Sequence, residues 1–374
     1  MLARIGDIFG EGSFEDLCLK IGFPLSIIVT AIVGSVFLAE VCKIRFFRVW
    51  VLFGGFASMF LAIPIGSSLL ISVILAIILG TSLGLGMPLC LSYFKESVSI
   101  ENRGKVGGIA LFVAIFSVPL FWIILSMLDL MTSAMFLAIW RIWTLPFLFS
   151  VSEKDRLLEP AEQKVTSMIS VLRDRTFSLY FTAWLMFALI DSFQTVVVAV
   201  AIGEFQFFIR VVEPICTGFS VLVAGVLSDW IGRKRVLIFG FVSLGIAYAT
   251  IGLLSQIWFA WLFFFIMDGI ALGLLWVLFM VLVWGDISTN SSEKFYAVGE
   301  TPFFLTETFS LLLAPYLASI PQGSSFSLAA FFLFLAVLPL LYAPETLPEK
   351  KIRERELKQY IDKAKKVKES TLKN

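Results

Sequence analysis

Charged and amide side chains occur inside several long apolar stretches, where such groups are costly. An ionisable side chain at the centre of a bilayer costs about 2.5–3.5 kcal/mol on insertion scales, and it generally faces a polar interior or a partner. Between 204 and 228, five polar residues follow one another at steps of 4, 3, 4 and 3. This spacing places them on one face of a helix: Gln206, Arg210, Glu213, Thr217 and Ser220.

Other polar residues lie at comparable depth in neighbouring stretches. Asp191 and Gln194 share a helical face, while Asp268 and Glu307 lie near the middle of two later apolar stretches, with Glu300 two turns before Glu307. A rise of 1.5 Å per residue brings Asp268 and Glu307 to similar depth. These groups predict a binding site for a polar ligand or a proton.

Arg210 has two possible roles. We expect it to pair with Glu213 or Asp268, and one acid among Glu213, Asp268 and Glu307 to bind the ligand or a coupling proton. In the alternative interpretation, Arg210 and Glu213 neutralise each other for membrane insertion only. Arg141 is the one charge near the middle of a stretch in the first half, where an interfacial position or an acid partner is expected.

The composition indicates where these residues lie. The 374 residues are 59% hydrophobic and 15% charged, with a mean hydropathy of +0.94, well above the apolar share of about 45–50% in soluble domains. There is no histidine, and the four cysteines have no paired spacing, so neither a disulfide framework nor a metal site is expected. Without a nucleophile–base pair or a phosphate-binding loop, we expect no enzyme, no cofactor and no nucleic-acid partner.

The apolar stretches are long enough to cross a bilayer, which takes about 20 residues each. Eleven are found, near 21–41, 48–66, 68–93, 107–128, 130–150, 177–201, 204–228, 236–254, 257–284, 297–318 and 324–343. Among the connections between these stretches, only every second one contains Lys or Arg, and the tail contains many lysines. By the positive-inside rule this predicts a cytoplasmic C-terminus and an extracellular N-terminus.

The chain repeats at an offset of 189–191 residues, which relates Glu40 to Asp229 and Arg103 to Lys294. The repeat predicts an all-α membrane protein of two helical bundles, with five spans and six spans. The expected segments are an extracellular segment (1–20), the first bundle (21–150), a cytoplasmic linker with an interfacial helix (151–176), the second bundle (177–343) and a charged cytoplasmic tail (344–374). The first helix of the first half is missing, because the true start lies upstream or because the helix has been lost.

The loop GVLSDWIGRKR (225–235) follows the second span of the second half. Gly225, Asp229, Gly232, Arg233, Lys234 and Arg235 resemble the signature loop of the major facilitator superfamily, G-x-x-x-D-R/K-x-G-R-K/R, with Trp230 in place of a cation. The resemblance implies that Gly225 packs on the span at 297–318. It also implies that Asp229 contacts the N-terminus of that span and the loop arginines, as a latch of the outward-facing state. An acid near a helix N-terminus is favourable by about 0.3–1 kcal/mol.

Two further motifs resemble the sugar-porter branch of this superfamily. The first motif, Y-x-x-E-x-x-x-x-x-x-R-G, is matched by Tyr93, Glu96, Arg103 and Gly104. The second is the tripeptide PET at 344–346, which contains Glu345 and resembles the start of PETKG. The paired glutamines of the branch are reduced to Gln194, and its PESPR element is absent. These departures leave the solute open.

The resemblance implies a multi-pass cell-membrane transporter, active or facilitative, that works by alternating access in the lipid bilayer. Its expected partners are a small polar organic solute, such as a sugar or an organic ion, and a proton or cation as co-substrate. We expect a monomer. The alternative is a transport-inactive or truncated relative that acts as a membrane sensor or scaffold.

Overall fold

The computed structural model describes residues 14–38, 43–62, 69–150, 167–201, 208–289 and 291–347. Within these ranges every regular element is a helix, and helices occupy all eleven predicted stretches. Nine are long and apolar enough to cross a membrane by length and composition. The other two, α3 and α16, have 17 residues each and are continued by short helices. The prediction of an all-α, multi-pass membrane protein is confirmed.

The first group of helices runs from α2 to α8. It consists of α2 (Phe14–Phe37), α3 (Lys43–Met59) with η1 (Phe60–Ala62), α4 (Leu69–Gly84), α5 (Met87–Ser97), α6 (Arg103–Met127), α7 (Leu130–Ile142) and α8 (Leu145–Ser150). The helix α2 begins earlier than predicted, inside the expected N-terminal segment. The described side chains of this group share a small apolar core.

The second group runs from α9 to α18. It consists of α9 (Met168–Arg173), α10 (Arg175–Ala201), η4 (Phe208–Val212), α11 (Glu213–Ile231), α12 (Arg233–Leu254), α13 (Trp258–Trp276), η5 (Val277–Leu282), α14 (Val283–Ile287), α15 (Ser292–Gly299), α16 (Thr301–Leu317), α17 (Gln322–Leu335) and α18 (Val337–Tyr342). Both η4 and η5 are π-helical turns. Of the linker, the structure describes the part from Ser167 onward, and the tail beyond Leu347 lies outside the described residues.

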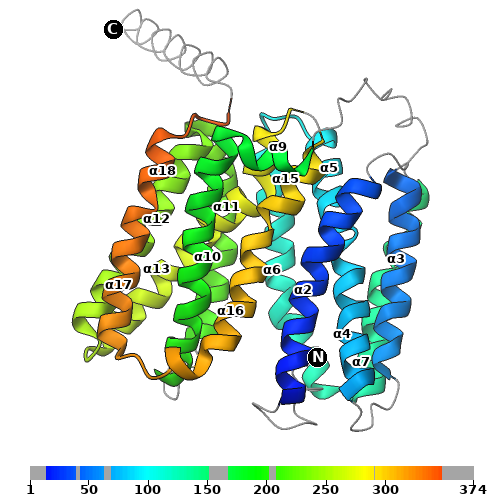
Figure 1. Ribbon diagram of the computed structural model, residues 1–374, viewed down its shortest axis with the longest axis horizontal. Helices are drawn as coiled ribbons and strands as arrows, with labels where there is room; N and C mark the ends of the chain where they lie inside the picture. The colour runs from blue at the N-terminus through cyan, green and yellow to red at the C-terminus, as the bar shows by residue number, and fades with distance from the viewer. Residues whose placement is uncertain are drawn as a thin grey trace, which may run out of the picture.

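The two groups stand side by side (Figure 1) and meet along two helix pairs, α6 with α11 and α2 with α16. Inside the groups, α2 packs on α4 as α11 packs on α13, and α3 packs on α7 as α12 packs on α17. The internal repeat therefore appears as matched packing, and the two-bundle fold is confirmed. The helix α10 packs on α16 and α17; the described part of the first group contains no counterpart of α10.

The second group has an extensive aromatic core. The Trp184 and Phe279 rings stack with centroids 4.8 Å apart, and Trp184 also stacks on Phe187 at 5.3 Å. Such pairs add about 0.5–1.5 kcal/mol beyond the apolar area that they bury. This core gives the polar residues of the second group a rigid frame.

Asp129 marks the turn between α6 and α7, on the side opposite the charged loops. Its carboxylate accepts hydrogen bonds from the Thr132 hydroxyl and from the backbone N–H groups of Thr132 and Met131. These bonds hold the pKa of Asp129 below its ordinary value, because they stabilise the charged form. Asp129 is thus an N-cap of α7.

Candidate functional site

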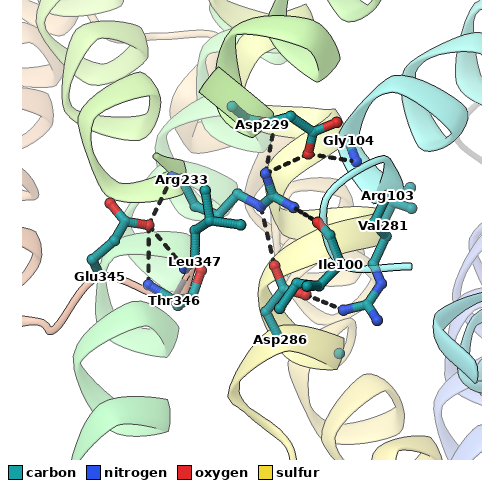
Figure 2. Close-up of polar contacts among 12 residues, drawn as sticks. Ile100, Arg103, Gly104, Asp229, Arg233, Val281, Asp286, Glu345, Thr346 and Leu347 are labelled. Atoms are coloured by element: carbon teal, nitrogen blue, oxygen red, sulfur yellow. Dashed lines mark hydrogen bonds and ion pairs between the residues drawn. The ribbon is translucent and has the colours of Figure 1, made fainter. Parts of the chain in front are cut away.

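A network of buried ion pairs joins the two groups at the end where the charged loops gather (Figure 2). Asp286 on α14 pairs with Arg103 at the start of α6 and with Arg233 at the start of α12, where Nε lies 3.1 Å from Oδ2. Arg233 also pairs with Asp229 at 2.6 Å. The side chains of Arg233 and Asp286 are 0% exposed. Removing one partner of such a buried pair strongly destabilises the folded protein, because the other charge stays buried without compensation.

Asp229 also caps a helix of the opposite group. Its carboxylate oxygens accept hydrogen bonds from the backbone N–H groups of Gly104 at 3.0 Å and Lys105 at 2.8 Å, at the N-terminus of α6. The prediction that Asp229 contacts the N-terminus of the 297–318 span is therefore wrong. The helix α11, the second span of the second half, packs instead on α6 of the first half, and the 297–318 span (α16) packs on α2.

Gly225 has the same partner helix, so its predicted packing on 297–318 is wrong as well. A Cβ on Gly225 would collide with the backbone of Gly104 and Gly108. Small residues four apart let two membrane helices approach closely. The predicted glycines Gly104 and Gly225 thus bring Asp229 within reach of the α6 N-terminus.

Glu345, which follows α18, binds the backbone of the signature loop. Its Oε1 atom accepts hydrogen bonds from the backbone N–H groups of Arg233 at 2.7 Å and of Thr346 and Leu347 at 3.0 and 3.1 Å. Gly232 has φ +101°, and a Cβ there would lie 2.5 Å from Oε2 of Glu345. Only glycine adopts this backbone region without a steric penalty.

The remaining cations of the loop do not belong to the ion-pair network. The Lys234 ammonium donates hydrogen bonds of 2.8 Å to the carbonyl oxygens of Leu341 and Ala343, which ties α12 to α18. Arg235 is exposed. The positive charge of Arg235 fits the expected asymmetry of the loops across the membrane.

A second set of polar contacts crosses between the groups through α5. The Lys95 ammonium donates hydrogen bonds to the Ser288 carbonyl at 2.9 Å and to its hydroxyl at 2.8 Å. The hydroxyls of Ser92 and Ser292 lie 2.8 Å apart. Glu96 pairs instead with Lys43 of its own group at 2.5 Å. The predicted loop residues of both halves therefore gather at one end of the molecule.

Asp286 is the member of the network that sequence reasoning missed. The repeat could have found it, because an offset of 190 residues relates Glu96 to Asp286, and the same offset relates Arg233 to position 43. The structure contains both pairs, Lys43–Glu96 and Arg233–Asp286. An internal ion pair is thus repeated in both halves.

Three acids lie together in the second group, namely Asp191 on α10, Glu213 at the start of α11 and Asp268 on α13. The Asp268 carboxyl interacts electrostatically with those of Glu213 and Asp191, and Glu213 with Asp191. Asp191 and Glu213 are half-buried and Asp268 is 7% exposed. The three residues form what we call the acidic triad.

Other predicted residues lie apart from the triad. Gln194 is buried and donates to the Ser325 carbonyl and hydroxyl at 3.1 and 2.9 Å, so it ties α10 to α17. Glu300 is buried beside Trp284. Glu307 is exposed and has no electrostatic interaction with the triad. Glu307 therefore lies apart from the triad, and the expectation that one acid among Glu213, Asp268 and Glu307 binds the ligand or a proton stays a prediction.

The predicted polar face of the 204–228 stretch is only partly present. Gln206 and the side chain of Arg210 lie outside the described residues. The π-helical turn η4 shifts the helical phase before Glu213. Thr217 and Ser220 are buried where α11 meets Gly273 of α13, and Ser220 donates to the Ile270 carbonyl at 2.6 Å. The hydroxyls therefore serve helix packing.

Arg141 has a different environment from the one predicted. Its guanidinium donates a 2.7 Å hydrogen bond to the Ser82 carbonyl and lies 5.2 Å from the centre of the Trp50 ring. Trp50 donates to the same carbonyl at 2.6 Å, just before the helix breaks between Gly84 and Met87. No acid among the described residues pairs with Arg141. It caps a broken helix.

The comparisons with known proteins agree with this geometry. Residues 208–372 match the sequence model of the Major Facilitator Superfamily. The structure is similar to that of the proton:xylose symporter XylE bound to 6-bromo-6-deoxy-D-glucose, with a TM-score of 0.69 and 17% identity over 92% of this chain and 91% of that one. It is also similar to the human organic anion transporter MFSD10, with a TM-score of 0.68 and 14% identity over 91% and 87% of the two chains.

A search of curated proteins by sequence found no match. The matched segment 208–372 and the fold of the whole confirm the predicted resemblance: the second group is similar in sequence to the major facilitator superfamily, and the whole structure has the two-bundle fold of the transporters named above. Among the described residues, no group of three or more His, Cys, Asp or Glu side chains is placed to hold a metal ion.

Proposed function

We propose that the protein is a secondary active or facilitative transporter that carries a small polar organic solute across the cell membrane by alternating access. The observation that carries this proposal is the distribution of polar contacts between the two groups. The links Arg103–Asp286, Ser92–Ser292 and Lys95–Ser288 lie at the end of the charged loops. They hold that end closed, and alternating access requires such links to break and re-form during transport.

The charged loops assign the closed end to the cytoplasm by the positive-inside rule. The arrangement then corresponds to an outward-facing or occluded state, with the C-terminus in the cytoplasm and the N-terminus outside. Opening toward the cytoplasm requires Arg103 to leave Asp286 and the N-terminus of α6 to leave Asp229.

The fold does not identify the solute, because one fold serves many functions. The solute is therefore proposed from the residues of the site. The two structural relatives are named for different solutes, a sugar with protons in one and organic anions in the other. Sugars and organic ions are both candidates for this chain, and the acidic triad supports a proton or another cation as co-substrate.

The proposal is tested with a disulfide cross-link between the two groups at the closed end. Ser92 and Ser292 are replaced by cysteine in a background in which the exposed Cys90 is serine, since the two hydroxyls lie 2.8 Å apart. Reconstituted protein is assayed for uptake of neutral sugars, polyols, organic cations and organic anions. We expect oxidation to cross-link the pair and stop uptake, and reduction to restore it.

The single Ser92→Cys variant is the matched control, and oxidation should leave its uptake unchanged. Uptake that continues through the cross-linked protein contradicts alternating access. A transport-inactive sensor or scaffold would take up none of the solutes even in the reduced form.

A further inference from the structure

The acidic triad is held by close helix packing. Gly269 of α13 lies against α11 so closely that a Cβ on it would be 2.6 Å from the Glu213 carbonyl oxygen and 2.8 Å from the Cys216 Cβ. One turn further on, Gly273 packs in the same way on Ser220. This contact places Asp268, the neighbour of Gly269, at the level of Glu213. The close contact between α11 and α13 thus fixes the relative positions of Glu213 and Asp268 along the two helices.

No described group donates a hydrogen bond to the three carboxyls. The Asp268 Oδ1 atom is buried and has no hydrogen-bond partner. A buried polar atom without a partner costs about 1–3 kcal/mol. Asp191 and Glu213 are half-buried residues. The triad therefore lacks the donors that normally accompany buried carboxylates.

An aromatic side chain completes the surroundings. Tyr248 of α12 is 3% exposed and interacts electrostatically with all three acids. Its ring packs edge-on against Phe264 and Phe326, with centroids 5.1 and 5.7 Å apart, which fixes its position. Carboxylates together with aromatic rings are the groups that bind ammonium and guanidinium cations.

A bare metal ion does not suit this arrangement. The carboxyls influence one another electrostatically, yet among the described residues they do not converge closely enough to hold a metal ion. Carboxylates that are spread over three helices suit a larger cation with several N–H donors, which can reach more than one of them.

We propose that Asp191, Glu213 and Asp268 bind the cationic group of an organic solute, an ammonium or a guanidinium, with Tyr248 beside it. This inference rests on the proposed transport function and narrows its solute from any small polar molecule to an organic cation. It needs no metal and no covalent step. A single cation neutralises carboxylates that otherwise repel one another, and it supplies the missing partner of Asp268.

Binding is measured on the full-length protein in detergent. The probes are butylammonium, guanidinium and agmatine as cations with N–H donors, mannitol as a neutral solute and lactate as an anion, each tested by thermal shift and calorimetry at one pH and ionic strength. We expect at least one cation to raise the melting temperature, and mannitol and lactate to have no effect. Asp268→Asn and Glu213→Gln should each weaken cation binding at least tenfold.

Asp129→Asn is the matched control, because it removes a carboxylate far from the triad while asparagine keeps the N-cap. It should bind the cation like the parent protein. The inference is wrong if none of the cations binds, or if the triad variants fold and bind the cation as tightly as the control does.

Uptake of the same probes into proteoliposomes separates the two proposals. Uptake of mannitol or lactate without any cation supports transport and overturns the triad as a cation site. Cation binding that depends on the triad, without uptake of any probe, supports the site and overturns transport.

Discussion

The two helix groups share a packing pattern but treat intramembrane charge in opposite ways. In the first group the intramembrane charge is positive and fully used, because Arg141 donates to the Ser82 carbonyl and lies over Trp50. In the second group the described carboxyls of the acidic triad lie within the spans, and no described group donates a hydrogen bond to them. Hydrogen bonds distinguish the two cases. Arg141 has its acceptors within the protein, whereas the triad carboxyls have no described donor and can accept hydrogen bonds from a ligand.

The same contrast applies to the repeated ion pair at the charged-loop end. Arg233–Asp286 is fully buried and connects to Arg103 of the other group, whereas Lys43–Glu96 is 19% and 37% exposed and stays inside its own group. The ion pair occurs in both halves, but only Arg233–Asp286 also links the two groups. The second group therefore contains both this ion pair and the acidic triad.

The largest expected effect comes from breaking the buried pair. Asp286→Ala leaves Arg103 and Arg233 buried without their shared carboxylate, so we expect a loss of about 3–5 kcal/mol of stability. Denaturant titration of the purified protein measures it. A loss no larger than that of the repeat-related Glu96→Ala would contradict the contrast between the two copies.

A smaller effect is expected in the first group. Arg141→Met removes the side-chain donors to the Ser82 carbonyl and hydroxyl, at a cost of about 1–3 kcal/mol. The matched control is Arg45→Met on α3, whose side chain is exposed. If both variants melt at the parent temperature, Arg141 does not support the helix break.

The exposed copy of the ion pair should matter less. Lys43→Ala removes the bond to Glu96 and should cost about 0–1 kcal/mol, the usual range for an exposed pair. The effect should shrink further at high salt, because surface pairs are screened. Melting curves at low and high ionic strength test this, and a salt-independent loss would show that the pair is not of the surface type.

The smallest effect on stability is expected at the triad. Asp268→Asn replaces an unpartnered carboxyl by a neutral amide of the same shape, so the melting temperature without ligand should stay the same or rise. Cation binding should be lost in the same variant. A marked drop in melting temperature would indicate that Asp268 supports the fold rather than a ligand.

Sequence reasoning reached much of the fold because hydropathy, the charge of the loops and the 189–191 repeat are periodic signals. It located Asp229, Arg233, Gly104 and Glu345 at one end. It chose the wrong partner for Asp229 because the resemblance names a motif and a helix number, while the contact depends on which helices cross between the halves. It missed Asp286, although the repeat points to it.

Depth along a helix also proved insufficient to predict which acids meet. Glu307 lies at the same predicted depth as Asp268, yet it is exposed and apart, while Asp191 joins the triad. Rotation about the helix axis decides this, and η4 shows that a π-helical turn alters rotation without a clear sequence signal.

The sequence by itself determined that this chain crosses a membrane many times, in two related sets of helices with their cations on one side. It did so because lipid excludes charge and every span must carry that exclusion in its own residues. Only the tertiary structure decided that Asp229 caps α6, that Asp286 joins two arginines and that Asp191, Glu213 and Asp268 come within electrostatic range of one another. Those contacts depend on how helices distant in sequence are rotated and paired, and close glycine packing such as that of Gly269 on α11 fixes them only once the chain has folded.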